Sequence, residues 1–209
     1  RRDAQQAGAA RYTPNLLDAA QAKEDEGQSF LQGQNFQAAQ QRFRDAEQGY
    51  RDASSEAQRL GILHQGAERL RTQAVEARRD AEQAEAPRFA SDQWALGTVK
   101  EAEGQTALSR QEFQTAEQRF REAQQEYQRA AGQARELARL QAERQRDAEG
   151  LRDRMIEARG QAERMDARRL ALSLWNAAAT KEQEGQFALG RQEYPTAEQR
   201  FQEAQAGYE

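Results

Sequence analysis

Few residues of this chain have side chains that could carry out covalent or metal chemistry. The 209 residues include one histidine, His64, and no cysteine. A single histidine cannot supply the ligand set of a zinc site, and without cysteine there is neither a thiolate nucleophile nor a disulfide. Nucleophile–base pairs are not expected for the same reason. We expect His64 to lie at the surface or in a helix seam, and we expect no catalytic residue.

Carboxylates are abundant, but their spacing does not match a known cation site. The run Glu24-Asp25-Glu26 lacks the Asp/Asn spacing and the glycine of a calcium loop. The chain has no Glu-x-x-His pair of the di-iron type and no glycine-rich phosphate loop. A solvated helix face explains the acidic run better. We therefore predict a protein that is not an enzyme and that has no metal, no cofactor and no evident small-molecule substrate.

One motif of charged residues recurs, because Lys-Glu-x-Glu-Gly stands at 23–27, 100–104 and 181–185. It could be a repeated ligand-contacting patch or one face of a helix, and we favour the helix face. In that reading the second Glu pairs with an Arg on the next helix, and the Gly allows close helix contact. The residues concerned are Glu26 with Arg42, Glu103 with Arg119, Glu184 with Arg200, and the glycines Gly27, Gly104 and Gly185.

The motif belongs to a longer internal repeat. Residues 94–127 and 175–208 are identical at 21 of 34 positions, and the motif glycines are 77 and 81 residues apart. The four-residue difference is about one helical turn, which favours a continuous helix at the insertion. We divide the chain into 1–11, the tail of a preceding repeat; 12–88, repeat 1; 89–169, repeat 2; and 170–209, a truncated repeat 3. This division suggests a segment of a longer array.

Composition restricts the fold class and the partners. Charged residues make up 32% of the chain, Pro occurs three times, and no apolar run approaches the ~18 residues of a membrane span. Acidic and basic residues are interspersed with a net charge of −4, which argues against a nucleic-acid-binding face. No targeting signal is evident, and the absence of Cys is compatible with the cytoplasm, the periplasm or the exterior. The composition is typical of coiled coils and long helices.

Each repeat is predicted to contain a shorter helix, a tight turn and a long helix. Aromatic residues and Ala alternate at steps of three and four at the start of the long helix, which places them on one face. We expect long helices over about 36–86 and 113–167 and a bend at Pro87. The joint at 165–172 has no Pro, so the sequence leaves open whether the helix continues through it. The predicted repeat core is Phe36, Phe43, Tyr50, Trp94, Phe113, Phe120, Tyr127, Trp175, Tyr194, Phe201 and Tyr208.

The second part of each long helix carries a weaker apolar seam. In repeat 2 this predicted seam includes Leu137, Leu140, Leu151, Met155 and Met165. A helix this polar does not remain folded alone, so the seam needs a partner. Either the following short helix folds back over it or another chain covers it.

About 20 residues of each repeat resemble the tetratricopeptide repeat. The resemblance rests on a Gly in the first helix, an aromatic residue nine positions later, and then Ala, an aromatic residue and Ala. In repeat 2 these are Gly104, Phe113, Ala116, Phe120 and Ala123. The period of 77–81 residues differs from the 34 of that family. The resemblance implies helical-hairpin packing and a protein-binding scaffold.

The predicted fold class is all-α, an elongated array of antiparallel helical hairpins with long coiled-coil-like helices. The favoured function is a non-catalytic scaffold or spacer that mediates protein–protein interaction, since the binding surface of such a protein grows with the number of repeats. One alternative is a self-associating coiled coil that builds a filament or oligomer. The other is a helical repeat that binds nucleic acid through Arg, which requires salt-dependent binding.

Overall fold

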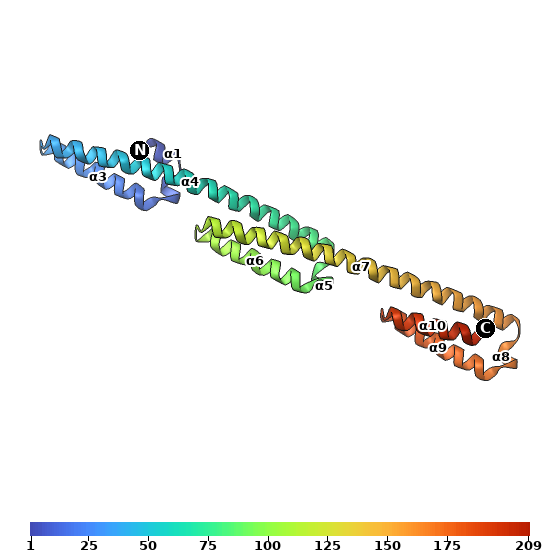
Figure 1. Ribbon diagram of the computed structural model, residues 1–209. Coiled ribbons are helices and arrows are strands. Elements are labelled where there is room, and N and C mark those ends of the chain that lie inside the picture. The colour runs from blue at the N-terminus through green and yellow to red at the C-terminus, as the bar shows by residue number, and fades with distance from the viewer. The chain divides into compact units, whose positions relative to one another are not determined.

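The computed structural model describes residues 1–209, and it is α-helical without any strand, which confirms the all-α class (Figure 1). Long helices alternate with shorter ones along the chain, and α10, which has 15 residues, is grouped with the long helices because it occupies their position in the repeat. The elements are α1 (Arg2–Gln6), α2 (Ala9–Tyr12), α3 (Pro14–Gln32), α4 (Phe36–Gln83), α5 (Ala86–Phe89), α6 (Ser91–Ser109), α7 (Phe113–Arg164), α8 (Ala167–Leu170), α9 (Leu172–Gly190) and α10 (Tyr194–Tyr208).

The chain forms two compact units, Arg1–Gly132 and Gln133–Glu209. We call them the first and the second unit. Their boundary lies inside α7 and within repeat 2. We call the part of a long helix that pairs with the preceding short helix its near half, and the remainder its far half. The far half of α4 is 58–83 and the far half of α7 is 133–164.

The short and long helices are joined by the same tight turn at three places. Gln34, Gln111 and Gln192 adopt the left-handed conformation, with φ of 58°, 60° and 61°. In each turn, the backbone N–H of the residue after the left-handed one donates to a carbonyl in the last turn of the helix. In the first turn, Asn35 N–H donates to Phe30 O at 2.9 Å. This is the hydrogen bonding of a Schellman motif, which ends a helix abruptly. A turn this short returns the chain along the helix it has just left.

A second left-handed residue follows the last turn of α1, α4 and α7. Gly8, Glu85 and Asp166 have φ of 77°, 57° and 61°, and they occupy the same position in successive repeats. The long helices accordingly stop at Gln83 and Arg164. The sequence left open whether the helix continues through the joint at 165–172, and in the structure α7 ends before it. Pro87 is not the cause of the break, because the same conformation occurs at Asp166, where no Pro is nearby.

In the first unit, the base of the first hairpin is packed almost entirely with alanine. Small side chains let α1, α2, α3 and α4 approach one another closely, and each buried methyl group adds to the stability. Tyr50 is the one large residue among the buried members, and Tyr12 and Leu17 pack on them from the edge. The buried set is Ala4, Ala9, Ala20, Ala46, Tyr50, Ala53 and Ala57.

In the second unit, the far half of α7 packs against the α9–α10 hairpin, and the three helices lie side by side (Figure 1). The hairpin that follows a long helix thus covers its seam, which was one of the two alternatives. Leu151 and Met155 are buried as predicted, but Leu137, Leu140 and Met165 are exposed. The rest of the buried seam is alanine: Ala148, Ala158 and Ala162.

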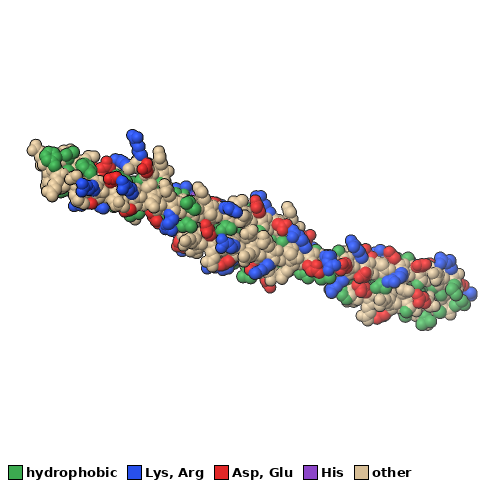
Figure 2. Space-filling model, turned by 45° about the horizontal axis from the view of Figure 1, so that its top comes forward, with side chains coloured by type: hydrophobic (Ala, Val, Ile, Leu, Met, Phe, Trp, Pro, Cys, Tyr) green, Lys and Arg blue, Asp and Glu red, His purple; other side chains and the backbone are tan.

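Charged side chains of both signs are interspersed over the face shown in Figure 2, without a single-sign patch. Such mixing is typical of a solvated helix surface. None of the helices combines the length and apolar character needed to cross a membrane.

Candidate functional site

The repeated motif Lys-Glu-x-Glu-Gly lies on the three short helices α3, α6 and α9, and both of its Glu positions and its Gly make the same contact in all three copies. The first Glu of the motif accepts a hydrogen bond from a tyrosine hydroxyl on the long helix. The distances are 2.5 Å for Tyr50 to Glu24, 2.8 Å for Tyr127 to Glu101 and 2.8 Å for Tyr208 to Glu182. Hydrogen bonds to a charged acceptor are stronger than those between neutral groups.

The same carboxylate also receives an arginine from the segment that precedes the short helix: the residue before α1 in the first hairpin, and the last part of α4 or α7 in the other two. Nη1 of Arg1, Arg78 and Arg159 lies 3.5, 3.2 and 2.7 Å from the carboxylates of Glu24, Glu101 and Glu182. We call each set of Arg, Glu and Tyr a clamp. A clamp joins three segments: the segment before the short helix, the short helix itself and the near half of the next long helix.

Burial makes the tyrosine hydroxyl of each clamp a weaker acid. Desolvation, followed by the hydrogen bond to Glu24, raises the pKa of Tyr50 to about 12. Desolvation also raises the pKa of Tyr127 to about 12, with Glu101 adding to the shift. The pKa of Tyr208 is raised by burial and by Glu182. The neutral, donating form of the hydroxyl is therefore the one the fold requires.

The second Glu of each motif faces an arginine on the long helix. Arg Nε lies 2.9 Å from the carboxylate in Glu26–Arg42, 3.2 Å in Glu103–Arg119 and 3.0 Å in Glu184–Arg200. The structure thus brings together the residues of all three predicted interhelical pairs. These pairs are largely exposed, so solvent screens them and each contributes little to stability.

The motif lysine belongs to the same charged cluster in two of the hairpins. Lys100 Nζ lies 3.1 Å from Glu103 and 3.7 Å from Glu122 on α7. Lys181 Nζ lies 3.0 Å from Glu184 and 3.7 Å from Glu203 on α10. The lysine therefore bridges the two helices instead of projecting freely into solvent.

The motif glycines lie directly against phenylalanine rings of the long helix. A Cβ atom built on Gly27, Gly104 or Gly185 would lie 2.9, 2.8 or 2.7 Å from the ring of Phe43, Phe120 or Phe201. Real Cβ atoms do not approach carbon so closely, so an alanine would force the ring or the helix to move. Glycine at these positions therefore sets the distance between the paired helices.

All but one of the predicted core residues are buried or partly buried. Phe120, Tyr127 and Phe201 are fully buried, and Phe113, Tyr194, Tyr50 and Tyr208 are nearly so. Trp94 and Trp175 are partly buried, with ring centroids 5.2 Å from Tyr127 and 5.0 Å from Tyr208. Phe43 is also partly buried. Phe36 is exposed, so its assignment to the core is wrong for this chain.

The histidine and the acidic run do not form a ligand site. His64 lies 3.3 Å from the Tyr12 hydroxyl, and its ring packs edge-on against Phe113. Glu24 accepts the hydrogen bond of its clamp tyrosine, and Glu26 is paired with Arg42. No group of three or more His, Asp or Glu side chains is placed to hold a metal ion.

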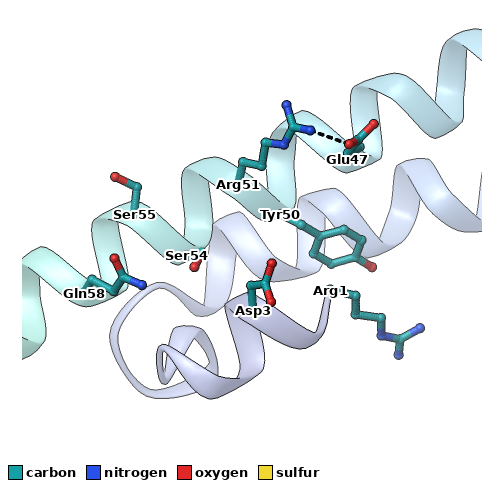
Figure 3. A pocket seen from close by; sticks show the side chains of 8 residues that line it. All are labelled: Arg1, Asp3, Glu47, Tyr50, Arg51, Ser54, Ser55 and Gln58. Carbon is teal, nitrogen blue, oxygen red and sulfur yellow. Dashed lines mark hydrogen bonds and ion pairs between the residues drawn. The ribbon is translucent and has the colours of Figure 1, made fainter.

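A polar hollow of about 380 Å³ borders the first clamp, between α1 and α4 (Figure 3). Arg1 and Asp3 line it from the α1 side, and the Tyr50 ring lies beside them in the figure. Arg51 is already paired with Glu47 at 2.5 Å. At the positions of Glu47 and Arg51, repeat 2 has Gln124 and Gln128, so the charged lining on the α4 side is not part of the repeat. The hollow is open and shallow, and it lacks the apolar enclosure typical of small-molecule sites.

The clamps are not among the sites predicted above, although the sequence contains a signal for them. In all three, the Arg precedes the Glu by 23 residues and the Tyr follows the Glu by 26. These separations stay constant although the repeat length changes from 77 to 81. Fixed spacing across a variable period indicates residues that touch one another.

Comparisons with known proteins add no relative to this picture. No family model matches the chain, and no curated protein or solved structure matches it either.

Proposed function

We propose that this protein is a non-catalytic helical-repeat scaffold, in which the repeated residues build the frame and the non-repeated surface residues contact a protein partner. The observation that carries the proposal is that the residues of Lys-Glu-x-Glu-Gly contact other residues of their own hairpin. Its recurrence would be the best sign of a repeated ligand site, yet its carboxylates and its glycine are engaged within the hairpin in all three copies.

The outward faces of the short helices support a role in partner binding. Leu96 and Val99 on α6 are 51% and 52% exposed, and Phe187 on α9 is 74% exposed. The matching residues in the other repeats are different: position 187 corresponds to Ser29 and Thr106. A constant interior with a variable apolar exterior is the arrangement through which repeat scaffolds recognise partners. The resemblance to tetratricopeptide repeats points the same way.

Light scattering tests this proposal against self-assembly. A scaffold of this kind stays at the monomer mass of about 23.7 kDa over a wide concentration range. A mass that rises with concentration to a defined oligomer or filament would favour the coiled-coil assembly instead.

Binding to DNA or RNA distinguishes the remaining alternative. We expect no binding that weakens steeply with salt, because the basic side chains are interspersed with acidic ones. Salt-dependent binding to either nucleic acid would contradict the scaffold proposal.

The surface itself is tested by the double variant Leu96→Ser/Val99→Ser, which should unfold at the same temperature as the unmodified chain because both side chains are exposed.

A further inference from the structure

The first residue of each long helix has the same place in the repeat but not the same surroundings. Phe113 is 3% exposed and Tyr194 is 6% exposed, whereas Phe36 is 67% exposed. All three follow the same left-handed turn, and all three stand 12 residues after the Glu of their clamp. The difference therefore comes from what lies on top of the residue.

In the first unit, Phe113 is covered by the far half of α4. The His64 ring packs edge-on against Phe113 with centroids 5.2 Å apart, and the Tyr12 ring does so at 6.1 Å. Leu60 and Leu63 also face this turn. The tip of one hairpin thus rests on the long helix before it.

In the second unit, Tyr194 makes the equivalent contact with the far half of α7. Its hydroxyl donates to Gln145 Oε1 at 3.3 Å, and Gln141 Nε2 donates to Gln192 in the turn at 2.9 Å. Gln145 thus takes the place that His64 has in the first unit. The chemistry of the contact varies, from ring on ring to hydroxyl on amide, but its position in the repeat does not.

The clamp fixes where such a covering helix must run. Arg78 follows His64 by 14 residues along α4, and Arg159 follows Gln145 by 14 residues along α7. Fourteen residues of helix span about 21 Å. Arg1 makes the same contact with Glu24 that Arg78 and Arg159 make in their clamps. Helix α1 therefore lies where the end of a long helix lies in the other repeats.

We propose that the hairpin tip at Phe36, together with the exposed Phe30 and Leu31, is a docking surface for the far half of a long helix from a further repeat of this kind, joined ahead of Arg1. The residue 14 positions before Arg1 would face the Phe36 ring. The inference rests on the proposed scaffold function, because it specifies how one repeat is added to the next. It continues a contact already made twice in this chain, and the two far halves present are occupied by Phe113 and Tyr194.

The test is an extended chain in which a second copy of residues 1–77 precedes the complete sequence. The junction keeps the repeat intact, because Arg1-Arg2-Asp3-Ala4 is identical to residues 78–81. The chain has no Cys, so Phe36→Cys in the original copy introduces a single thiol whose labelling rate reports its exposure. We expect rapid labelling in the 209-residue chain and labelling slower by a factor of about ten or more in the extended chain, since a buried group reacts only when it opens.

Circular dichroism shows whether each variant is folded, and hydrogen exchange of the Phe30–Phe36 amides without any Cys gives a second readout. Phe113→Cys serves as the matched control and should be protected in both chains. Equal labelling of position 36 in a folded, extended chain would overturn the docking proposal while leaving a monomeric scaffold intact. Protection of position 36 in the 209-residue chain that grows with concentration would also overturn it, because a second copy would then be the occupant.

Discussion

The α3–α4 hairpin of the first unit and the α9–α10 hairpin of the second unit share the same repeated contacts, but their helices bury the phenylalanine between them to different extents. Both have a clamp and a glycine under a phenylalanine ring. In the second unit Phe201 is fully buried, whereas in the first Phe43 is partly exposed.

The surroundings of the two clamps differ in the same direction. Trp175 packs against the clamp tyrosine in the second unit, and the smaller Leu17 takes that position in the first. The pair Arg200–Glu203 is 2.7 Å apart, but Arg42–Asp45 is 3.9 Å apart. Comparing the hairpins therefore separates what every repeat needs, the clamp and the glycine contact, from what sets how tightly each repeat closes.

The largest effect is expected from removing the buried phenylalanine ring. Phe201→Ala should destabilise the second unit by about 3–5 kcal/mol, because it leaves a cavity in a fully packed site. Phe43→Ala should cost less, since part of that ring is already in contact with water. Hydrogen exchange resolved by helix measures the two hairpins separately, and equal losses would show that the hairpins are closed to the same extent.

The next effect is steric and should have opposite signs at two glycines of the second unit. Gly185→Ala should destabilise by about 1–3 kcal/mol, because its methyl group would overlap the Phe201 ring. Gly150→Ala, which meets nothing within 4 Å, should stabilise α7 by up to about 1 kcal/mol through helix propensity. Urea denaturation checks both values. A neutral Gly185→Ala would contradict the assigned role of the motif glycine.

The clamps predict a loss of stability at alkaline pH. The pKa of Tyr127 is about 12 in the fold, compared with 10.0 for the free side chain. Its contribution is complete below pH 10 and is lost as the pH rises from about 10 towards 12. Tyr127→Phe should be less stable near neutral pH and should show a weaker decline over this range. Melting temperatures of the two proteins from about pH 8 to 12 provide the measurement, and parallel curves would exclude the clamp as the cause.

The smallest effects concern the left-handed residues at the turns and joints. Gln34→Gly and Asp166→Gly should each stabilise by up to about 1 kcal/mol, since glycine adopts positive φ without steric cost. Gly8→Ala should destabilise by a similar amount, although its Cβ would lie no closer than 3.6 Å to Tyr12. Thermal melting compares the three variants. Stabilisation by Gly8→Ala would mean that the backbone relaxes at this joint.

The sequence was sufficient to predict the parts that depend on periodicity. Spacings of three and four identified the buried stripe of Phe120, Tyr127 and Ala123, and the all-α class followed from the composition. The C-terminal ends of the long helices could not be predicted, because Glu85 and Asp166 adopt a conformation that their residue types seldom take. The exposure of Phe36 could not be predicted either, because it depends on a neighbouring helix and not on the local pattern. The clamps required comparing separations between distant residues.

We infer that the repeated glutamates hold the fold together, and a double-mutant cycle on Tyr127 and Glu101 measures this contribution. The unfolding free energies of Tyr127→Phe, Glu101→Gln and the double variant give the coupling between the two side chains. We expect a coupling of about 1.5–3 kcal/mol, the range for hydrogen bonds to charged groups. The exposed pair Glu103 and Arg119 is the matched control and should give a smaller coupling. A Tyr127–Glu101 coupling indistinguishable from zero would contradict the account and leave the repeated glutamate free for another role.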